Sequence, residues 1–358
     1  MNNLLPMDPI LTAFNQAQFE FGDLCRRFQG YAFEALGLGP NESSYRIAAS
    51  GTFWRLRDYG GQTGGPSVLI IAAPIKRPYI WDLCPSVSVI RLCMQHGVRV
   101  HLLDWLPATP ATGNNGLREH MDAIRRCVGE IADEIGNAKP YLFGHSLGGT
   151  LAAMFGALAS DAIRGIALLG APLCFKPAAS RFRDSLVSLV PSGLPDAIPC
   201  PGSLLSSVSA LASPETFIWS RFADAAFSLA DGHGLEIHGR VERWALDEAP
   251  LPGRLAHQLV DWLYREDRFC RGVLAIGGRS LGPQSVAAPM LAIVNTADDV
   301  APRGSIEPFV EAMGTSDARI VEYPGETGVS LQHLGLLIGQ AARAQVWPKI
   351  LSWMSARA

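Results

Sequence analysis

"YLFGHSLGGTLAAM", residues 141–154, indicates the architecture of this chain. An apolar run at 140–144 precedes the serine, and a run of small and apolar residues at 146–160 follows it. A G-x-S-x-G pentapeptide between a buried strand and a helix is typical of a sharp turn that exposes the serine hydroxyl. Side chains at Gly144 and Gly148 would collide with the neighbouring strands and helix. The pattern therefore predicts that Ser146 is a nucleophile.

The alternative is a turn of small residues that only packs a helix against a sheet and contains a serine by coincidence. The pentapeptide alone is common, but the strand before it and the helix after it favour the nucleophile. The backbone N–H of Leu147 would then lie at a helix N-terminus, where the helix dipole favours negative charge. We expect Leu147 to donate a hydrogen bond to an oxyanion formed on the substrate.

Short apolar runs alternate with helical patterns over much of the chain. They predict strands at 67–73, 98–105, 140–144, 163–172, 289–295 and 318–325, and helices at 8–36, 86–96, 116–136, 146–160 and 339–355. Residues 45–60 alternate in part and predict a hairpin or an edge strand. Apolar strands that alternate with helices are typical of a mostly parallel sheet flanked by helices. The predicted fold class is α/β.

One region interrupts this alternation. Residues 176–285 hold a proline-rich stretch, several tryptophans and helical patterns, so we interpret them as an inserted cap or lid. The predicted organisation is an N-terminal helical segment at 1–44, a core at 45–175 and 286–358, and the cap at 176–285.

A serine nucleophile needs a base, and the base needs an acid that orients it. In chains with this turn the order is serine, then aspartate or glutamate, then histidine. After the strand at 289–295 the only histidine is His333, which we predict to be the base. Asp298 is the predicted acid and Asp299 its competitor, because neighbouring side chains point in different directions. His145, beside the serine, is expected to pack rather than to react.

Composition excludes several classes of function. The chain has 358 residues, 48% of them hydrophobic, and a net charge of −3 without a basic block, so a nucleic-acid partner is not expected. No apolar run is long enough to cross a bilayer, and the N-terminal residues do not resemble a secretory signal. The seven scattered cysteines predict free, mostly buried thiols and no metal site. We expect a cytoplasmic protein without a cofactor.

Several segments resemble polyhydroxyalkanoate synthases of the short class III type. They are APIKRPYIWDLCPSVSVIRLCMQHGVRVHLLDW (73–105), WALDEAPLPGRLAHQLVDWLYREDRF (244–269), DDVAPRGSIEPF (298–309) and QHLGLLIGQAARAQVWPKILSWM (332–354). The resemblance covers about residues 45–355 in the same order. It implies an α/β-hydrolase fold with a cap over the active site, and a dimer formed through that cap. It also implies Ser146, Asp298 and His333 as the catalytic residues, and a second oxyanion donor near Ile75.

The synthases that this chain resembles carry cysteine where it has Ser146. They move 3-hydroxyacyl groups from coenzyme A onto that thiol, whereas an ester on serine is usually resolved by water or an alcohol. The leading prediction is therefore a serine hydrolase of acyl esters or thioesters. Two alternatives remain. One is an acyltransferase that moves an acyl group from coenzyme A or a carrier protein to an alcohol. The other is a non-catalytic partner of a synthase.

Overall fold

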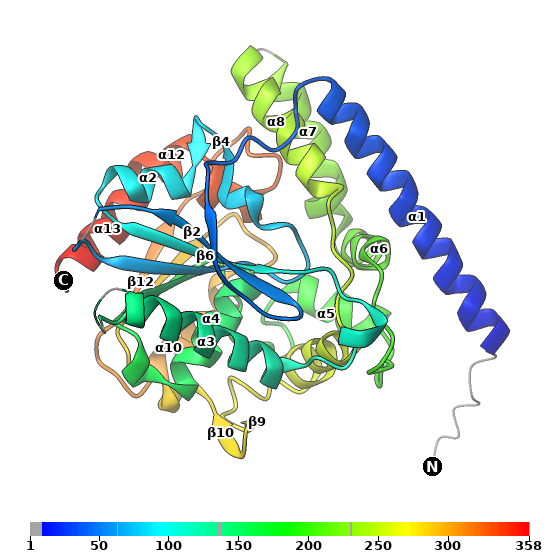
Figure 1. The fold of residues 1–358 in the computed structure, drawn as a ribbon. Helices are drawn as coiled ribbons and strands as arrows, with labels where there is room; N and C mark the ends of the chain where they lie inside the picture. Colours follow the sequence, from blue (N-terminus) through cyan, green and yellow to red (C-terminus); the bar gives the residue numbers. More distant parts are fainter. Residues whose placement is uncertain (1–8, 63, 135, 137, 230, 358) are drawn as a thin grey trace.

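An eight-stranded sheet runs through the centre of the molecule (Figure 1). The computed structural model describes residues 9–62, 64–134, 136, 138–229 and 231–357. The strands follow one another across the sheet in this order: β1 (Arg46–Ser50), β2 (Trp54–Gly60), β6 (Arg99–Trp105), β3 (Ser67–Ile71), β7 (Tyr141–His145), β8 (Gly165–Leu169), β11 (Met290–Asn295) and β12 (Ala318–Tyr323). The strand pairs from β6 to β12 are parallel, and β1 and β2 form an antiparallel hairpin that pairs with β6. The predicted mostly parallel sheet and the hairpin at 45–60 are confirmed.

Helices cover both faces of this sheet, as predicted (Figure 1). The two faces bury separate apolar cores, and strand β3 shows why: Val68 and Ile70 belong to one core, and Leu69 and Ile71 to the other. Alternate side chains of a strand point to opposite faces, so a strand buried on both sides must be apolar throughout. One face is packed by α3 (Leu117–Glu134), α4 (Leu147–Leu158) and α10 (Glu307–Glu311), and the other by α2 (Val89–Gln95), α11 (Gly335–Ile338), α12 (Gln340–Gln345) and α13 (Trp347–Ser355).

Short elements connect these layers. They are η1 (Pro78–Trp81), β4 (Asp82–Cys84), β5 (Val87–Ser88), η2 (Pro110–Thr112), η3 (Ser160–Ala162), η6 (Pro283–Ser285), η7 (Arg303–Ser305) and η8 (Gln332–Leu334). Strands β4 and β5 pair with each other and stand outside the main sheet. The segment from β3 to α2 therefore contains η1 and this small pair of strands instead of entering a helix directly.

A largely helical region separates β8 from β11 in the sequence, at the place where the cap is predicted. Its elements are α5 (Arg181–Leu189), α6 (Gly202–Ala212), η4 (Glu215–Trp219), α7 (Ser220–Ser228), α8 (Gly232–Ala245), α9 (Gly253–His257), η5 (Gln258–Arg265) and the small hairpin of β9 (Leu274–Ile276) and β10 (Arg279–Leu281). We refer to residues 176–285 as the predicted cap.

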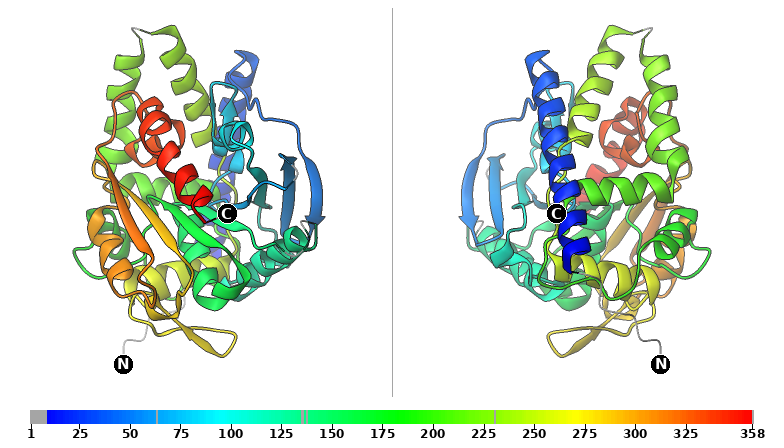
Figure 2. Two further views of the ribbon diagram at one scale, coloured as in Figure 1. Left: turned by 90° about the vertical axis from the view of Figure 1, so that its left-hand side faces the viewer. Right: turned by 90° about the vertical axis from the view of Figure 1, so that its right-hand side faces the viewer.

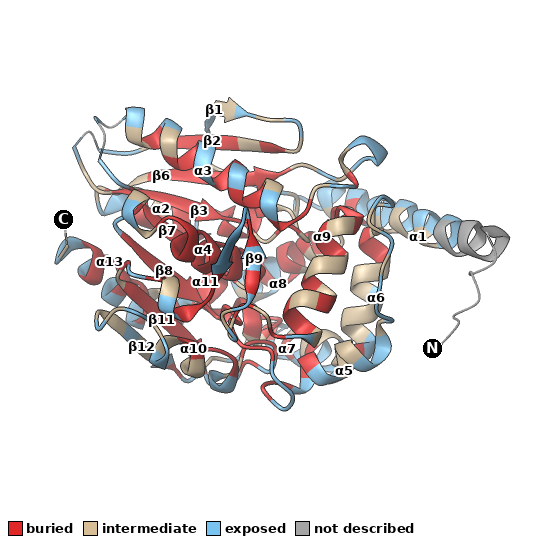
Figure 3. Cartoon of the chain, turned by 90° about the horizontal axis from the view of Figure 1, so that it is seen from below, coloured by how far each residue is buried: buried red, intermediate tan, exposed pale blue. Residues whose placement is uncertain are grey.

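Helix α1 (Pro9–Ala35) packs against α6 and α8 of the predicted cap (Figures 1 and 2). The backbone N–H of Ser203 donates to Asp23 Oδ1 over 2.6 Å, and the Arg243 guanidinium pairs with Glu34 Oε1 at 2.5 Å. The opposite face of the helix is open, with Phe28 65% and Tyr31 60% exposed (Figure 3). The helix predicted at 8–36 is therefore present, attached to the predicted cap, while residues 1–8 of the predicted segment lie outside the described residues.

The prediction of free thiols is wrong for two of the seven cysteines. Cys174, which follows β8, and Cys270, which follows η5, form a disulfide that joins the core to the predicted cap. They are 96 residues apart in the sequence, so their spacing gave no sign that they meet. The other five are free, and Cys84, Cys93 and Cys127 are buried, as expected.

Candidate active site

Ser146 lies in the sharp turn between β7 and α4, with φ 56° and ψ −135°. A serine rarely adopts a positive φ, and such strained residues are concentrated at functional sites. A Cβ at Gly148 would lie 2.2 Å from the Ile71 carbonyl oxygen, and one at Gly144 would lie 2.5 Å from the Gly149 Cα. Both contacts are with backbone and far too short. The need for glycine at both positions is thus confirmed, and the turn holds Ser146 at the carboxyl end of the sheet.

Asp298 and His333 form a buried pair in two loops at the same end of the sheet. Asp298 follows β11 and His333 lies in η8 after β12, and His333 Nδ1 is 2.6 Å from Asp298 Oδ2. The backbone N–H of Val300 donates to the other oxygen, Oδ1, over 2.9 Å. Burial opposes ionisation of Asp298, but the charge and hydrogen bond of His333 and the Val300 N–H outweigh it and lower the pKa of Asp298. The carboxylate therefore stays ionised beside the imidazole.

The structure distinguishes the two adjacent aspartates. Asp298 is only 2% exposed and contacts the histidine, whereas Asp299 is exposed. The sequence left Asp299 as a competitor, and the contact with His333 belongs to Asp298.

His333 Nε2 is buried and has no hydrogen-bond partner in the described part of the chain. With Nδ1 occupied by the carboxylate, the Nε2 atom is the nitrogen that can exchange a proton with a group in the cavity. Ser146 and His333 line the same cavity. In unliganded enzymes the contact from nucleophile to base is often long and tightens only when substrate is bound.

Two further residues, Gly170 and His145, adjoin the pair of Asp298 and His333. The sequence did not indicate this role for either of them. Gly170, after β8, has φ +50°, and a Cβ there would lie 3.3 Å from Asp298 Oδ2 and 3.8 Å from His333 Nδ1. His145 Nε2 lies 2.6 Å from the His333 carbonyl oxygen, to which it donates. Burial, and then the charge that a protonated His333 carries, lower the pKa of His145 to about 3, so His145 is neutral. It was expected to pack; it also anchors the backbone of His333.

The two predicted oxyanion donors line the cavity with Ser146. Leu147 is the first residue of α4, as the motif requires, and Ile75 lies in the loop between β3 and η1. Pro74 in that loop has no N–H to donate. Ala73 is a further amide close to the turn, since a Cβ at Gly148 would lie 3.0 Å from its nitrogen. The assignment of Ile75 stays a prediction.

The cavity has a volume of about 750 Å³ and is lined mainly by apolar side chains. Its walls come from α1, from the loop after β3, from the Ser146 turn, from the loops that carry Val300 and His333, and from α5, α6, η4, α7, α8, α9 and η5 of the predicted cap. A volume in the range of small-molecule sites with a few convergent polar groups is typical of a substrate pocket. Leu186, Leu205 and Leu259 are among its apolar lining residues.

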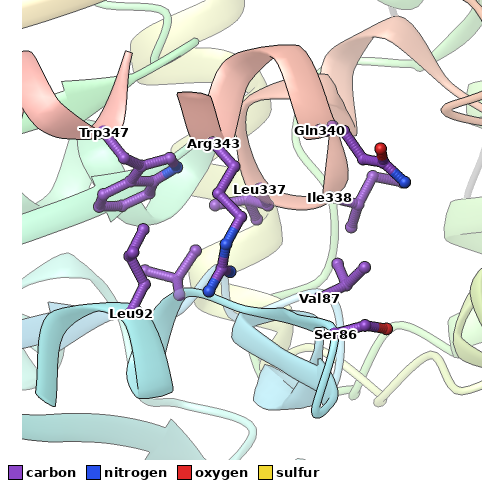
Figure 4. A pocket seen from close by; sticks show the side chains of 10 residues that line it. Ser86, Val87, Leu92, Leu337, Ile338, Gln340, Arg343 and Trp347 are labelled. Carbon is purple, nitrogen blue, oxygen red and sulfur yellow. The ribbon is translucent and has the colours of Figure 1, made fainter. Parts of the chain in front are cut away.

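Two other candidate sites lack the features of a substrate pocket. A hollow between β5 and α2 on one side and α11 to α13 on the other holds about 10 Å³, room for about one water molecule (Figure 4). Asp58, His101 and Glu134 come close enough to share a metal ion, but Arg46 and Arg99 already pair with both carboxylates. That cluster is explained as an ion-pair network.

Within the described residues no helix is both long and apolar enough to span a bilayer.

A family model described as alpha/beta hydrolase fold matches residues 77–190. Among solved structures, the chain is similar to a putative lipase from Sulfolobus solfataricus (TM-score 0.58, 16% identity, covering 89% of this chain and 97% of that one). It is also similar to a monoacylglycerol lipase from Paleococcus ferrophilus (TM-score 0.51, 18% identity, 85% and 99%). At such identities the likeness concerns the fold. The chain has the α/β-hydrolase fold.

Curated relatives are poly(3-hydroxyalkanoate) polymerase subunits PhaC. The protein from Haloferax mediterranei is 26% identical over 331 residues (90% of this chain, 65% of the relative), and that from Haloarcula marismortui 25% identical over 294 residues (81% and 61%). The protein from Allochromatium vinosum is 23% identical over 329 residues and 90% of both chains. This chain thus spans less than two thirds of the length of the two haloarchaeal relatives. The predicted resemblance is confirmed as distant homology to PhaC, while the class III type and the exchange of cysteine for Ser146 stay predictions.

Proposed function

We propose that this protein is a serine hydrolase of acyl esters or acyl thioesters that works through Ser146, His333 and Asp298. One observation carries the proposal: among the described residues the Nε2 atom of His333 has no hydrogen-bond partner. Asp298 holds the same ring, with 2.6 Å between Nδ1 and Oδ2, and the ring lines the cavity that Ser146 also lines. A buried imidazole with one nitrogen on a carboxylate and the other free is arranged to accept a proton from a hydroxyl.

The reaction begins when His333 Nε2 takes the proton of the Ser146 hydroxyl as Oγ attacks the substrate carbonyl carbon. Asp298 keeps the Nδ1 proton in place and stabilises the imidazolium. The N–H groups of Leu147 and Ile75 hold the oxyanion, and loss of one such donor typically costs about 3 kcal/mol of activation free energy. The bond to the leaving group then breaks, and the leaving group takes the proton from His333.

Water resolves the acyl-serine. His333 accepts a proton from the water molecule, the hydroxide adds to the acyl carbon, and collapse of the second intermediate returns the proton to Ser146 Oγ and releases the acid. The apolar walls of the cavity favour a medium or long acyl chain over a short polar one.

The experiment is a panel of p-nitrophenyl esters and acyl-coenzyme A thioesters assayed on wild type, Ser146→Ala and the exposed-site control Ser316→Ala. A fluorophosphonate probe is applied to the same three proteins. We expect turnover and labelling in wild type and control, and neither in Ser146→Ala. Labelling that persists in Ser146→Ala would show that another residue is the nucleophile. An inert, unlabelled wild type would instead support a non-catalytic partner of a synthase.

Transfer to an alcohol is the second candidate, and the distant homology to proteins named as polymerases favours it. The burial of His333 and Asp298 also fits a site that restricts water. The test incubates the same acyl donors with and without a hydroxyacyl acceptor. An ester product formed at the expense of free acid supports transfer, and free acid alone supports hydrolysis.

A further inference from the structure

One part of the cavity wall is cationic, although the chain as a whole is acidic. The charged residues that line the cavity, apart from its histidines, are Arg26, Lys76, Arg77, Arg221 and Glu248. The charge of Arg221 is balanced by Glu242, which does not line the cavity and binds the guanidinium in a bidentate pair. Three cations therefore remain against one carboxylate.

The single carboxylate, Glu248, is already fully engaged. Lys76 Nζ lies 2.5 Å from Oε1, Arg26 Nη2 lies 3.4 Å from Oε2, and the hydroxyl of Ser206 also donates to Oε2. Lys76 and Arg26 both donate to the carbonyl oxygen of Ala245 as well, over 2.8 and 2.6 Å. These two cations are thus held together at one place, with one negative charge between them.

Part of this donor capacity is unused. The Nε atom of Arg26 is buried and has no hydrogen-bond partner among the residues that the structure describes. The guanidinium of Arg77 takes part in no hydrogen bond or ion pair within the described ranges, while its backbone carbonyl accepts a hydrogen bond from the Trp244 indole N–H over 2.8 Å. Arg77 is half-buried and lines the cavity, and a guanidinium binds a carboxylate or a phosphate strongly because two of its N–H groups can donate to two oxygens of the anion.

The position of these cations relates them to the reacting atoms. Lys76 and Arg77 directly follow Ile75, the predicted oxyanion donor, in the loop after β3. Arg26 reaches the same place from α1, and an isolated backbone bridge pairs Lys76 with Glu248. These cations therefore line the same cavity as Ser146 and lie next to the proposed oxyanion donor in the sequence.

We propose that Arg26, Lys76 and Arg77 form a subsite for an anionic group of the acyl substrate, with α1 as one wall of that subsite. The inference rests on the proposed function, because it names the substrate class of the same cavity. The anion is a carboxylate at the far end of the acyl chain or a phosphate on the leaving group, and both would be bound by the same three cations.

The test uses matched pairs of substrates with one acyl length. Mono-p-nitrophenyl adipate is compared with p-nitrophenyl hexanoate for the carboxylate, and hexanoyl-coenzyme A with the N-acetylcysteamine thioester of hexanoate for the phosphate. Arg77→Gln and Arg26→Gln are measured beside Arg27→Gln, which removes an exposed arginine next to Arg26 on α1. Loss of a charged hydrogen bond should lower kcat/KM for the anionic member of one pair by about tenfold, with its neutral member and the control unchanged. The pair that responds identifies the source of the anion.

A second measurement separates this inference from the proposed function. Ser146→Ala keeps the cavity but cannot turn over, so calorimetric titration with coenzyme A and with adipate reports binding alone. Binding of one of them that weakens about tenfold on adding Arg77→Gln supports the subsite even if no substrate is hydrolysed. Wild type that hydrolyses neutral esters, while its Ser146→Ala variant binds neither anion, would retain the proposed function and refute the subsite. Equal losses for neutral and anionic substrates in both arginine variants would also refute it.

Discussion

His145 offers a sharp test of how the proposed base is held, because its hydrogen bond and its titration can be removed separately. Its Nε2 donates to the His333 carbonyl oxygen over 2.6 Å, and its pKa is lowered to about 3 by burial and then by the charge of His333. His145→Gln keeps an amide donor near the position of Nε2 but cannot titrate. His145→Phe keeps the ring packing and loses both the donor and the titration.

The magnitude follows from the pKa. In the unfolded chain a histidine titrates near 6.5, so between that pH and about 3 the unfolded state binds one more proton than the folded state at residue 145. The contribution of His145 to the free energy of unfolding is therefore fully present above pH 6.5, and it is lost as the pH drops toward about 3. At pH 5 the loss is about 2 kcal/mol, from about 1.4 kcal/mol per pH unit.

The assay is urea unfolding of wild type and both variants at pH 7 and pH 5. His120, also buried and with its pKa lowered to about 4, contributes equally to all three proteins and cancels in the difference. Between pH 7 and pH 5 the free energy of unfolding should fall by about 2 kcal/mol less in both variants than in wild type. At pH 7, His145→Phe should be less stable by about 1 to 3 kcal/mol because the buried carbonyl has lost its donor. A wild type whose pH dependence matches that of both variants would refute the reasoning.

Activity provides the second readout. His145→Gln should retain turnover at pH 7, whereas His145→Phe should lose about tenfold or more in kcat, since misplacement of a reacting group by about 1 Å is that costly. Equal kcat for the two variants would mean that the bond to the His333 carbonyl does not position the ring.

Three further predictions concern other contacts. Asp298→Asn should lower kcat by about 10⁴-fold, by analogy with triads of this type, while Asp299→Asn leaves it unchanged; steady-state kinetics of both decide between the two aspartates. Gly170→Ala should lower kcat and destabilise the fold by about 1 to 2 kcal/mol, because alanine disfavours the positive φ and its methyl group would press on the carboxylate; a variant with wild-type kcat and Tm would contradict this. Removing the disulfide with Cys174→Ser and Cys270→Ser should reduce the free energy of unfolding by about 2 to 4 kcal/mol without abolishing activity, as measured by urea titration of both forms.

The sheet and the turn could be predicted because their signals are local. A strand buried on both faces is apolar along most of its length, as in residues 68–71 of β3 and in β8, and the turn needs glycine where its backbone meets a neighbouring strand or helix. Asp298 and His333 could be proposed from chain order, since the carboxyl ends of parallel strands meet at one edge of the sheet. Asp299 could not be excluded in that way, because the direction of a side chain in a loop depends on contacts that the sequence does not display.

Contacts between residues far apart in the chain could not be predicted from the sequence. The bond between Cys174 and Cys270, the donation from His145 to the backbone of His333, and the approach of Arg26 to Glu248 each join segments from 96 to more than 200 residues apart. The local pattern of residues in either segment is the same whether or not such a contact forms. One signal was available for His145, since its neighbour Ser146 was already predicted to react.

The location of α1 has a consequence for how the protein is made. Asp23 bonds to Ser203, 180 residues later, and Arg26 to Ala245, 219 residues later. At ribosomal rates of about 5 to 20 residues per second, some 10 to 40 s pass between synthesis of this helix and synthesis of its binding surface. During that interval α6 and α8, which α1 contacts in the folded protein, have not been synthesised, so we expect α1 to be accessible to chaperones. The wall that carries Arg26 can form only after the chain has been synthesised as far as Glu248.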